Sequence, residues 1–350
     1  MKHQTTRYGE IPFYKIGTFG NTADAFISKK LFLEYKTKYS FPKKGDILIS
    51  ASGTIGRAVI YDGKPAYFQD SNIVWIDNDE TLVKNDFLFY AYSNVKWNTE
   101  HTTILRLYND NFRNTLIPLP PLNEQNAIAN VLSDLDRYLC TLDALILKKE
   151  GVKKALSFEL LSQRKRLKGF NQAWQRVRLG DICEIVKGQQ INKISLNNTD
   201  KYPVINGGID FLGYTNKFNV SKNTITISEG GTCGYVRFMT SNFWSGGHNY
   251  SLQKISNKVN NLCLYHILKS YEKDIMKLGV GSGLKNIQLK ALKDFEIPIP
   301  PLNEQSAIAN ILSALDNEIA SLKNKKRQFE NIKKALNHDL MSAKIRVLEK

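Results

Sequence analysis

A glycine-rich stretch in the last third of the chain, GVGSGLKNIQ at residues 279–288, carries side chains that suit contact with a nucleic acid. Lys285 can donate to a phosphate oxygen, and the amide of Asn286 can both donate to and accept from a base edge. The glycines follow a GxGxG spacing rather than the GxGxxG of a dinucleotide-binding turn, and no clear strand precedes them. The stretch is therefore typical either of a loop that contacts phosphates or bases or of a solvated surface loop.

Two other glycine-containing motifs resemble each other. ILISASGTIG covers residues 47–56 and ITISEGGTCG covers residues 225–234. Each predicts a strand, a turn and a second strand. The glycines suit the positive φ of a tight hairpin, and they equally suit a loop shaped around a phosphate or a base edge. The matched residues are Ile49, Ser50, Gly53, Thr54 and Gly56 in the first motif, and Ile227, Ser228, Gly231, Thr232 and Gly234 in the second.

The sequence shows no motif of a complete active site. Its Pro-Pro steps stand in LPPL and IPPL, which lack the polar acceptor and the aromatic ring that an amino-methyltransferase places against a flipped base. Neither a P-loop nor an HExxH motif occurs. Asp294 with Glu296, and Glu349 with Lys350, come near a nuclease pattern, although surface charges are the simpler interpretation. We therefore expect no catalysis by the chain itself.

The composition favours an anionic partner. Lysine and arginine number 49 against 33 aspartates and glutamates, a formal net charge of +16, so nucleic acid is the first candidate. No apolar run approaches the ~20 residues of a membrane span, and the opening MKHQTTRYGE is unlike a signal peptide, so we expect a cytoplasmic protein without a membrane partner. No metal site is expected, because the cysteines lack ligand spacing and suit buried free thiols. They are Cys140, Cys183, Cys233 and Cys263.

An internal repeat must position these loops. PLPPLNEQNAIANVLSDLD begins at Pro118, and PIPPLNEQSAIANILSALD begins at Pro298, 180 residues later. The prolines suit an extended entry into a helix and predict Asn123 and Asn303 as N-caps. Apolar residues then recur every three or four positions, which predicts two helices of about 40 residues, ~60 Å each. The apolar seam consists of Ile128, Leu132, Leu135, Leu139, Leu142, Ile146, Leu156 and Leu160, and in the second copy of Ile308, Leu312, Leu315, Ile319, Leu322, Phe329, Leu336 and Leu340.

The simplest arrangement buries the two seams against each other across a pseudo-two-fold axis, as a coiled coil. A leucine-zipper dimer with basic DNA-reading helices would need a longer basic run than RKRLKGF at Arg164. A coiled-coil scaffold without a role in DNA binding would explain the repeat but neither the charge nor the paired loop-rich regions. The charge and the paired loop-rich regions therefore favour DNA binding over a scaffold without that role.

Two variable regions, each followed by a long helix opening PLPPLNEQ or PIPPLNEQ, resemble the specificity subunit of type I restriction-modification systems. The resemblance covers nearly the whole chain. It implies an α/β fold, with two target recognition domains separated by a long antiparallel two-helix coiled coil. Each domain would read one half of a bipartite site in double-stranded DNA, and the helices would dock two methyltransferase subunits, joined by restriction subunits in the full complex. S-adenosylmethionine, ATP and Mg²⁺ would bind those partners, and this chain would hold no cofactor.

The resemblance divides the chain into a first recognition domain at residues 1–117, a repeated helix at 118–169, a second domain at 170–297 and a second helix at 298–350. The second domain opens with WQRVRLGDICEIVKGQQINK, residues 174–193, and the first has no counterpart to this segment. YGEIPFYKIG at Tyr8 corresponds instead to KYPVINGG at Lys201. The first domain is therefore expected to lack roughly twenty residues of framework. Either the true start of the domain lies upstream, or the circular pseudo-symmetry of the family lets another part of the chain fill the gap.

We interpret the chain as a non-catalytic DNA-binding specificity subunit. The alternative is a stand-alone DNA methyltransferase or endonuclease with an unrecognised active site, which methyl transfer without a partner would favour. The predicted DNA-binding residues are Lys15, Thr18, Ser52, Thr54, Arg57, Arg106, Lys187, Gln189, Gln190, Asn206, Tyr214, Thr232, Tyr235, Lys285 and Asn286. The predicted partner-binding residues are Leu122, Asn123, Glu124, Gln125, Leu302, Asn303, Glu304 and Gln305.

Overall fold

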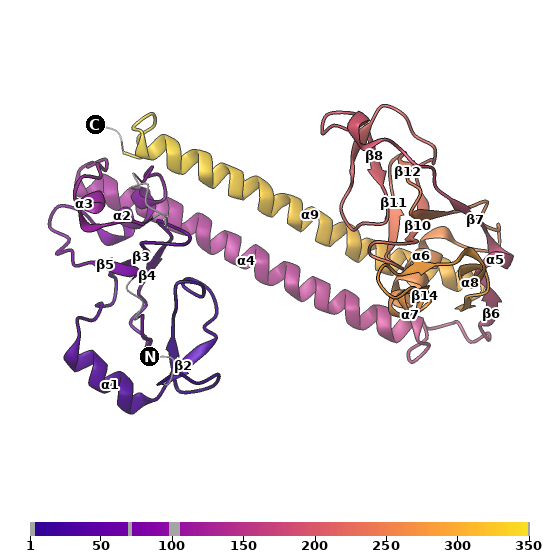
Figure 1. Ribbon diagram of the computed structural model, residues 1–350, viewed down its shortest axis with the longest axis horizontal. Coiled ribbons are helices and arrows are strands. Elements are labelled where there is room, and N and C mark those ends of the chain that lie inside the picture. The colour runs from indigo at the N-terminus through magenta and orange to yellow at the C-terminus, as the bar shows by residue number, and fades with distance from the viewer. Residues whose placement is uncertain (1–3, 69–71, 98–105, 349–350) are drawn as a thin grey trace. The chain divides into compact units, whose positions relative to one another are not determined.

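The computed structural model describes residues 4–68, 72–97 and 106–348. The chain forms two compact units, one of Met1–Asp143 with Asn324–Lys350 and the other of Ala144–Lys323. These are called the first unit and the second unit. Two long helices, α4 at Leu122–Leu161 and α9 at Leu302–Met341, each contribute one half to either unit (Figure 1). Each unit therefore combines an α/β domain with half of both long helices.

The long helices match the predicted repeat in length, at 40 residues each. They begin earlier than predicted. The backbone N–H of Gln125 donates to Pro121 O at 2.9 Å, and that of Gln305 donates to Pro301 O at 3.0 Å. The cap positions therefore belong to these prolines, whose carbonyls accept the first helical hydrogen bonds. The prediction that Asn123 and Asn303 are N-caps is wrong, because both lie inside the first turn.

The halves of α4 and α9 run antiparallel in each unit. In the first unit Asp136 pairs with Lys333 at 2.5 Å and Asp143 pairs with Lys326 at 2.7 Å. In the second unit Lys149 pairs with Glu318 at 2.7 Å, and Lys153 pairs with Asp316. Residue numbers rise along α4 as they fall along α9 in both units, and Leu142, Ile146 and Ile319 of the predicted seam are buried within the stretch that these ion pairs span. The predicted antiparallel pairing of the repeated helices is confirmed.

The second unit carries the larger set of strands. β11, β10, β13 and β7 form one sheet in that order, β12, β8 and β9 form another, and β6 pairs with β16. The strands are β6 Gln175–Arg178, β7 Glu184–Lys187, β8 Tyr202–Ile205, β9 Gly213–Thr215, β10 Thr224–Ser228, β11 Val236–Met239, β12 Trp244–Ser245, β13 Asn249–Gln253, β14 Gly279–Val280, β15 Asn286–Ile287 and β16 Glu296–Ile299. The short helices are α5 Leu179–Ile182, η2 Lys193–Ser195, α6 Asn261–Ser270, α7 Glu272–Lys277 and α8 Leu289–Lys293.

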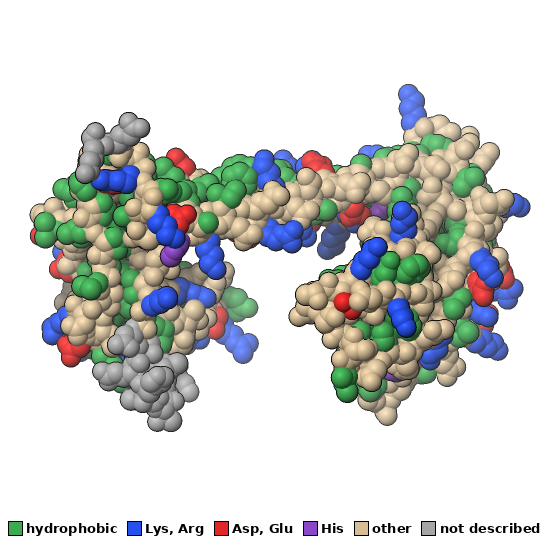
Figure 2. Space-filling view, turned by 90° about the horizontal axis from the view of Figure 1, so that it is seen from above, with side chains coloured by type: hydrophobic (Ala, Val, Ile, Leu, Met, Phe, Trp, Pro, Cys, Tyr) green, Lys and Arg blue, Asp and Glu red, His purple; other side chains and the backbone are tan. Residues whose placement is uncertain are grey.

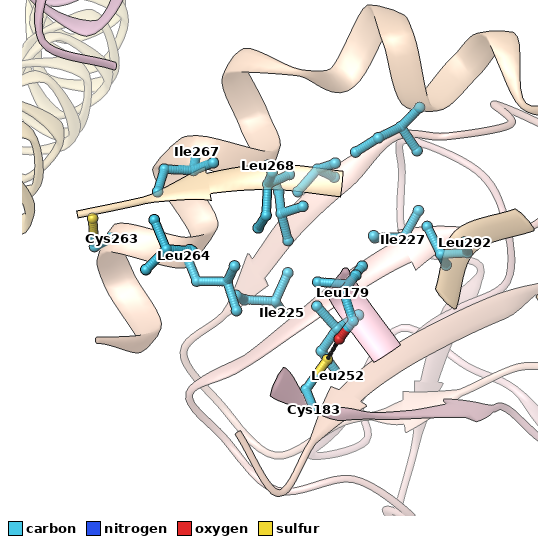
Figure 3. Close-up of a cluster of buried hydrophobic side chains, with 14 of the residues drawn as sticks. Leu179, Cys183, Ile225, Ile227, Leu252, Cys263, Leu264, Ile267, Leu268 and Leu292 are labelled. Carbon is cyan, nitrogen blue, oxygen red and sulfur yellow. Dashed lines mark hydrogen bonds between the residues drawn. The ribbon is translucent and has the colours of Figure 1, made fainter. Parts of the chain in front are cut away.

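One continuous core holds the second unit together (Figure 3). The apolar residues of β10, Ile225 and Ile227, meet Leu264 of α6 and Leu179 of α5, and each of these side chains has an exposed fraction of 0%. Fully burying such a side chain contributes ~1.5–3 kcal/mol, so the core fixes where the strands end. The loops that leave these strands are thereby held in place.

The first unit repeats the same plan with fewer strands. β1 Ile11–Phe13 and β2 Ala25–Ile27 pair as β8 and β9 do, and β4 Ala58–Ile60, β3 Ile47–Ser50 and β5 Ile73–Ile76 pair as β11, β10 and β13 do. Its short helices are α1 Lys29–Lys38, α2 Asn85–Tyr92 and α3 Asn109–Arg113. The first strand of this unit is thus the counterpart of β8, and its described residues include no segment equivalent to Trp174–Lys187.

The cysteines differ in burial. Cys183 and Cys263 are buried free thiols as predicted, and burial raises the pKa of each to about 12. Cys140 is exposed on α4, so the prediction of burial is wrong there, because that helix position faces away from the seam. Among the described residues, no histidine, cysteine and carboxylate side chains gather as a metal site would require. No helix in the described parts of the chain is long and apolar enough to cross a membrane.

A buried histidine lies between α6 and α9 in the second unit. His266 has an exposed fraction of 4%, and its Nε2 lies 3.2 Å from Ser313 Oγ. Burial lowers the pKa of His266 to about 4; the charge of Asp316 opposes this shift and that of Lys153 adds to it. His266 is therefore neutral at physiological pH.

Acidification to about pH 5 is expected to destabilise the protein through His266. An unfolded histidine has a pKa of ~6.5, so between pH 6.5 and 4 the unfolded chain binds a proton that the folded chain does not. Protonation of His266 therefore leaves the free energy of unfolding unchanged above pH 6.5. As the pH falls below that value the free energy of unfolding decreases, by about 2 kcal/mol at about pH 5. Urea unfolding at neutral and acidic pH measures this, and His266→Gln should reduce the difference. An unchanged pH dependence in that variant would contradict the assignment.

Candidate nucleic-acid interface

Loops from separate parts of the second unit meet at the ends of its strands. Four backbone hydrogen bonds of 2.8–3.0 Å connect these loops. The N–H of Gln189 donates to Ser245 O, that of Thr232 to Gly207 O, that of Glu229 to His248 O, and that of Ile287 to Glu229 O. The loops after β7, β8 and β10 are thereby joined to the turn before β13 and to β15. This loop cluster brings together the predicted DNA-binding residues Lys187, Gln189, Gln190, Asn206, Thr232, Lys285 and Asn286.

The Glu229 carboxylate contacts several polar and charged side chains of this loop cluster. Its side chain is mostly buried, its Oε1 accepts from Lys187 Nζ at 2.6 Å, and the Tyr250 hydroxyl lies 3.2 Å away. His248 Nδ1 lies 3.7 Å from the other carboxylate oxygen. Burial and the neighbouring Glu229 charge raise the pKa of Tyr250 to about 12, so this hydroxyl remains protonated. The carboxylate holds the exposed ammonium of Lys187 in place at the rim of the cluster.

Amide side chains complete the polar surface. Asn206 Oδ1 accepts from the backbone N–H of His248 at 2.9 Å, which fixes the orientation of that amide. Asn286 and Lys285 are exposed on and before β15. Asparagine suits adenine edges, and lysine suits phosphate oxygens or guanine edges. The cluster therefore presents both kinds of group that recognition of DNA needs.

Glycines let these loops approach one another. Gly207 has a φ of +81°, and a Cβ there would lie 2.5 Å from Gly230 O. A Cβ on Gly230 would lie 2.2 Å from Asn286 Oδ1. The glycines therefore serve turn geometry and bring polar loops close together, whereas contact of these loops with a phosphate or a base edge stays a prediction.

Two predicted residues belong to a neighbouring aromatic group. The ring of Tyr235 lies under Lys269 Nζ at 4.1 Å and near the Arg237 guanidinium at 5.4 Å. Arg237 also lies over the ring of Phe211 at 5.1 Å, and Phe211 contacts Tyr214 with centroids 6.1 Å apart. The rings of Tyr235 and Phe211 therefore alternate with the cations of Lys269 and Arg237, and Tyr214 packs against Phe211 at the end of this group.

The first unit has a smaller loop cluster of the same design. The backbones of Ser52 and Arg106 form an isolated antiparallel β-bridge. Beside it the backbone N–H of Leu107 donates to Ala51 O at 2.7 Å, as the N–H of Ile287 donates to Glu229 O in the second unit. Arg57 Nη1 donates to Phe19 O at 3.0 Å. This joins the loop of Thr54 to the loop that holds Lys15 and Thr18, where Lys15 also pairs with Asp24 at 2.8 Å. Residues 103–105, which immediately precede the predicted DNA-binding residue Arg106, lie outside the described residues.

The units that carry the two loop clusters have basic surfaces. Lysine and arginine side chains are spread over both units on the face shown in Figure 2, with fewer acidic ones between them. This distribution accords with the net charge of +16. A basic surface around polar loops attracts the phosphates of a duplex before any base is read.

The repeated LNEQ motif acts within the chain. Glu304 accepts from Arg166 and from Trp174 Nε1, while its counterpart Glu124 accepts from Arg346 Nε at 3.0 Å. That ion pair lowers the pKa of Glu124. Both carboxylates are buried, and each joins the start of one long helix to the segment that follows the other.

Each glutamine of the motif secures a recognition domain. Gln125 Oε1 accepts from Lys84 N at 2.8 Å, and Gln305 Oε1 accepts from Asn260 N at 2.6 Å. The exposed members of the predicted partner-binding set are Leu122, Asn123, Leu302 and Asn303. Partner binding by this set stays a prediction, and it now centres on these exposed residues.

Sequence reasoning missed the groups that orient the cluster. Glu229, His248 and Trp244 were not predicted, although Trp244 Nε1 donates to Gln189 O at 2.9 Å. Glu229 immediately precedes a Gly-Gly step, and His248 follows another. An ionisable residue next to two consecutive glycines was therefore the sequence signal that could have indicated Glu229 and His248.

The duplicated fold agrees with the comparisons with known proteins. A family model described as the type I restriction modification DNA specificity domain matches residues 1–149 and 171–331, once over each repeat. The chain belongs to this family. The resemblance seen in the repeated helix openings is thereby confirmed, together with the fold class of two recognition domains and repeated helices.

Relatives within the specificity-subunit family cover different shares of the chain. A protein of Haemophilus influenzae named as a type I restriction enzyme specificity subunit is 62% identical over 137 residues, 39% of this chain and 36% of that protein. A type I restriction enzyme specificity subunit of Methanocaldococcus jannaschii is 26% identical over 363 residues, covering 93% of this chain and 84% of the relative. The crystal structure of a type I restriction-modification S subunit from M. genitalium covers 97% of this chain and 91% of its own, with a TM-score of 0.72 and 21% identity, and supports the fold.

Proposed function

We propose that the chain is the DNA-binding specificity subunit of a type I restriction-modification complex, and that each unit reads one half of a bipartite site. The observation that carries this proposal is the occurrence of equivalent polar loop clusters in both units. The cluster of the second unit contains Lys187 and Asn286, and that of the first contains Arg57 and Ser52. Two such clusters on one chain suit two separate stretches of a duplex with unread base pairs between them.

The two kinds of side chain have different roles. Lys285 and Arg57 contact phosphates or guanine edges, which positions the unit and makes binding sensitive to salt. Gln189, Asn206 and Asn286 read base edges in the major groove. The family membership and the net charge of +16 support this division of roles.

Catalysis belongs to partner subunits. Two methyltransferase subunits dock on the repeated helices, near the exposed Leu122 and Leu302, and restriction subunits join the full complex in the cytoplasm. S-adenosylmethionine, ATP and Mg²⁺ bind those partners. Incubating the purified chain with S-adenosylmethionine and DNA tests this point: we expect no methyl transfer, whereas transfer without a partner would favour the alternative of a stand-alone DNA-modifying enzyme.

Replacing Lys285 and Asn286 together by alanine is expected to weaken binding to cognate DNA and to relax discrimination at one position of one half-site. The lost base contact corresponds to ~1–3 kcal/mol, and the lost phosphate contact lowers the slope of log affinity against log salt by about 1. Fluorescence anisotropy across a salt series measures both. Lys290→Ala is the control, because it removes the same charge from an exposed position on α8. Unchanged affinity, salt slope and recognised sequence in the double variant would rule this loop out.

A further inference from the structure

A negatively charged side chain lies within the loop cluster of the second unit, whose other predicted DNA-binding groups are cationic or neutral. Glu229 immediately follows β10, and a Cβ on the next residue, Gly230, would lie 2.2 Å from Asn286 Oδ1. A carboxylate at a surface that meets a duplex is repelled by the phosphates, because like charges that face each other weaken an interface. Glu229 is therefore compatible with tight binding only where the DNA supplies a hydrogen-bond donor.

The two carboxylate oxygens of Glu229 have different surroundings. Oε1 accepts from Lys187 Nζ at 2.6 Å and lies 3.2 Å from the Tyr250 hydroxyl. The contact that the structure shows for Oε2 is with His248 Nδ1 at 3.7 Å, which is beyond hydrogen-bond distance. An ionised carboxylate has about four acceptor positions. Among the described residues, Oε2 thus retains the capacity to accept from a further donor.

Lys187 supplies donors beside this acceptor. Its ammonium has three N–H donors, of which the hydrogen bond to Glu229 takes one. The side chain of Lys187 has an exposed fraction of 53%, against 11% for Glu229, so the ammonium extends further into solvent than the carboxylate. The ion pair therefore presents a fixed acceptor next to donors that remain available to a ligand.

A donor next to an acceptor is complementary to one edge of a G·C base pair. In the major groove guanine presents N7 and O6 as acceptors, and cytosine presents its N4 amino group as a donor beside O6. A lysine pairs with guanine O6 and N7, and a glutamate accepts from cytosine N4. In a T·A pair a methyl group replaces one acceptor, and the adenine amino group lies beside N7, which repels a carboxylate. The ion pair therefore favours G·C over the other base pairs.

The first unit has a different residue at the position of Glu229. The backbone N–H of Leu107 donates to Ala51 O, as that of Ile287 donates to Glu229 O, so Ala51 is the counterpart of Glu229. An alanine side chain can neither accept from a base nor hold a lysine. Recognition of a base pair by this kind of ion pair is therefore confined to the second unit.

We infer that Glu229 and Lys187 together specify one G·C base pair in the half-site that the second unit reads. Glu229 Oε2 accepts from cytosine N4, and Lys187 Nζ donates to guanine O6 and N7. The Tyr250 hydroxyl beside Oε1 helps to hold the carboxylate in place. This inference rests on the proposed function, and it adds a base identity and an acidic specificity-determining residue to that function.

A change in the DNA alone tests the inference with the wild-type chain. The duplex carries the motif found by methylome sequencing, and each specified G·C pair is replaced in turn while anisotropy measures affinity. We expect one G·C pair whose replacement by A·T weakens binding by about tenfold or more. N4-methylcytosine at that position keeps the base pair but puts a methyl group in place of the amino hydrogen that faces the groove. It should weaken binding by a similar factor, and no folding defect of a variant enters this result.

A matched pair of variants tests the assignment to Glu229. Glu229→Gln keeps the size of the side chain, but its amide offers a donor as well as an acceptor, so the preference for G·C over A·T should fall below about threefold. Affinity for an unrelated duplex should be unchanged or higher, because a negative charge is removed near the phosphates. Glu184→Gln is the control, since Glu184 lies at the other end of β7 from Lys187 and also pairs with a lysine, Lys254, at 2.8 Å. It should leave the preference unchanged.

The outcomes separate this inference from the proposed function. A motif without such a G·C pair, indifference of the wild type to N4-methylcytosine, or a preference that persists in Glu229→Gln would overturn the inference while specific DNA binding stood. An equal loss of preference in Glu184→Gln would also overturn it. Binding to the motif no tighter than to an unrelated duplex would contradict the proposed function itself, and the inference with it.

Discussion

Replacing Glu304 by glutamine is expected to lower the free energy of unfolding by about 3 kcal/mol, because it breaks a buried ion pair and leaves Arg166 without its partner. The Glu304 side chain has an exposed fraction of 1%, and it accepts from Arg166 Nε at 2.7 Å and from Trp174 Nε1 at 3.0 Å. These bonds join α9 to the segment that leads into β6. Urea unfolding of the wild type and the variant at neutral pH measures the loss.

The matched control for this variant is Glu124→Gln, at the equivalent position of the repeat. Arg346 has an exposed side-chain fraction of 46%, against 24% for Arg166, and Glu124 has no tryptophan donor among the described residues. A more exposed partner is better solvated when its ion pair is broken, so the loss should be smaller for Glu124→Gln. Equal losses at the two positions would show that burial and the tryptophan do not distinguish them.

Replacing Gly207 by alanine is expected to lower affinity for cognate DNA by about tenfold or more, equivalent to ~1.4 kcal/mol. The backbone conformation there costs a non-glycine residue ~1–2 kcal/mol, and the added Cβ would lie 2.5 Å from Gly230 O and 3.1 Å from His248 O. The loop that carries Asn206 would therefore move away from the loops of Gly230 and His248. Anisotropy with a cognate duplex measures the affinity, and thermal unfolding measures the accompanying destabilisation.

The adjacent glycine provides the control for the loop geometry. Gly208 has no unusual φ, and the nearest atom to an added Cβ lies at 3.6 Å, so Gly208→Ala should leave affinity within about twofold. If Gly207→Ala destabilised the fold but left DNA affinity unchanged, the loop cluster would be structural and would not face DNA. If the variants weakened binding equally, contact with the duplex by this turn rather than the spacing of the loops would be responsible.

The long helices were the most predictable part of the fold. Ile128, Leu132 and their counterparts repeat at helical spacing, and the near-identical copies impose a two-fold relation, so local pattern alone indicates paired helices. The same sequence misplaced the helix starts, because the proline carbonyls cap the helices one residue before Leu122 and Leu302. A proline at the N-cap has no side-chain oxygen that accepts from the first N–H groups of the helix, so the usual sequence signal of an N-cap is missing there.

The candidate site was predictable in its glycine-rich loops and not in the groups that orient them. Lys187, Asn206 and Asn286 were predicted from residue type and do lie in one cluster. Glu229 was missed, because its pairing with Lys187 spans 42 residues and depends on how the strands register. The role of the LNEQ glutamates within the chain was missed for the same reason. Glu304 pairs with an arginine 138 residues away and Glu124 with one 222 residues away, and no local sequence pattern indicates such pairs.

Sequencing the methylome of cells that carry this chain with a cognate methyltransferase subunit tests the central claim most directly. The predicted result is methylation of one motif with two specified parts separated by a fixed unspecified spacer, which disappears when the chain is omitted. Substitutions in the second unit's loop cluster, such as Asn286→Ala, should change one part and leave the other intact. Methylation that does not depend on the chain, or a single contiguous motif altered throughout by that substitution, would contradict the account.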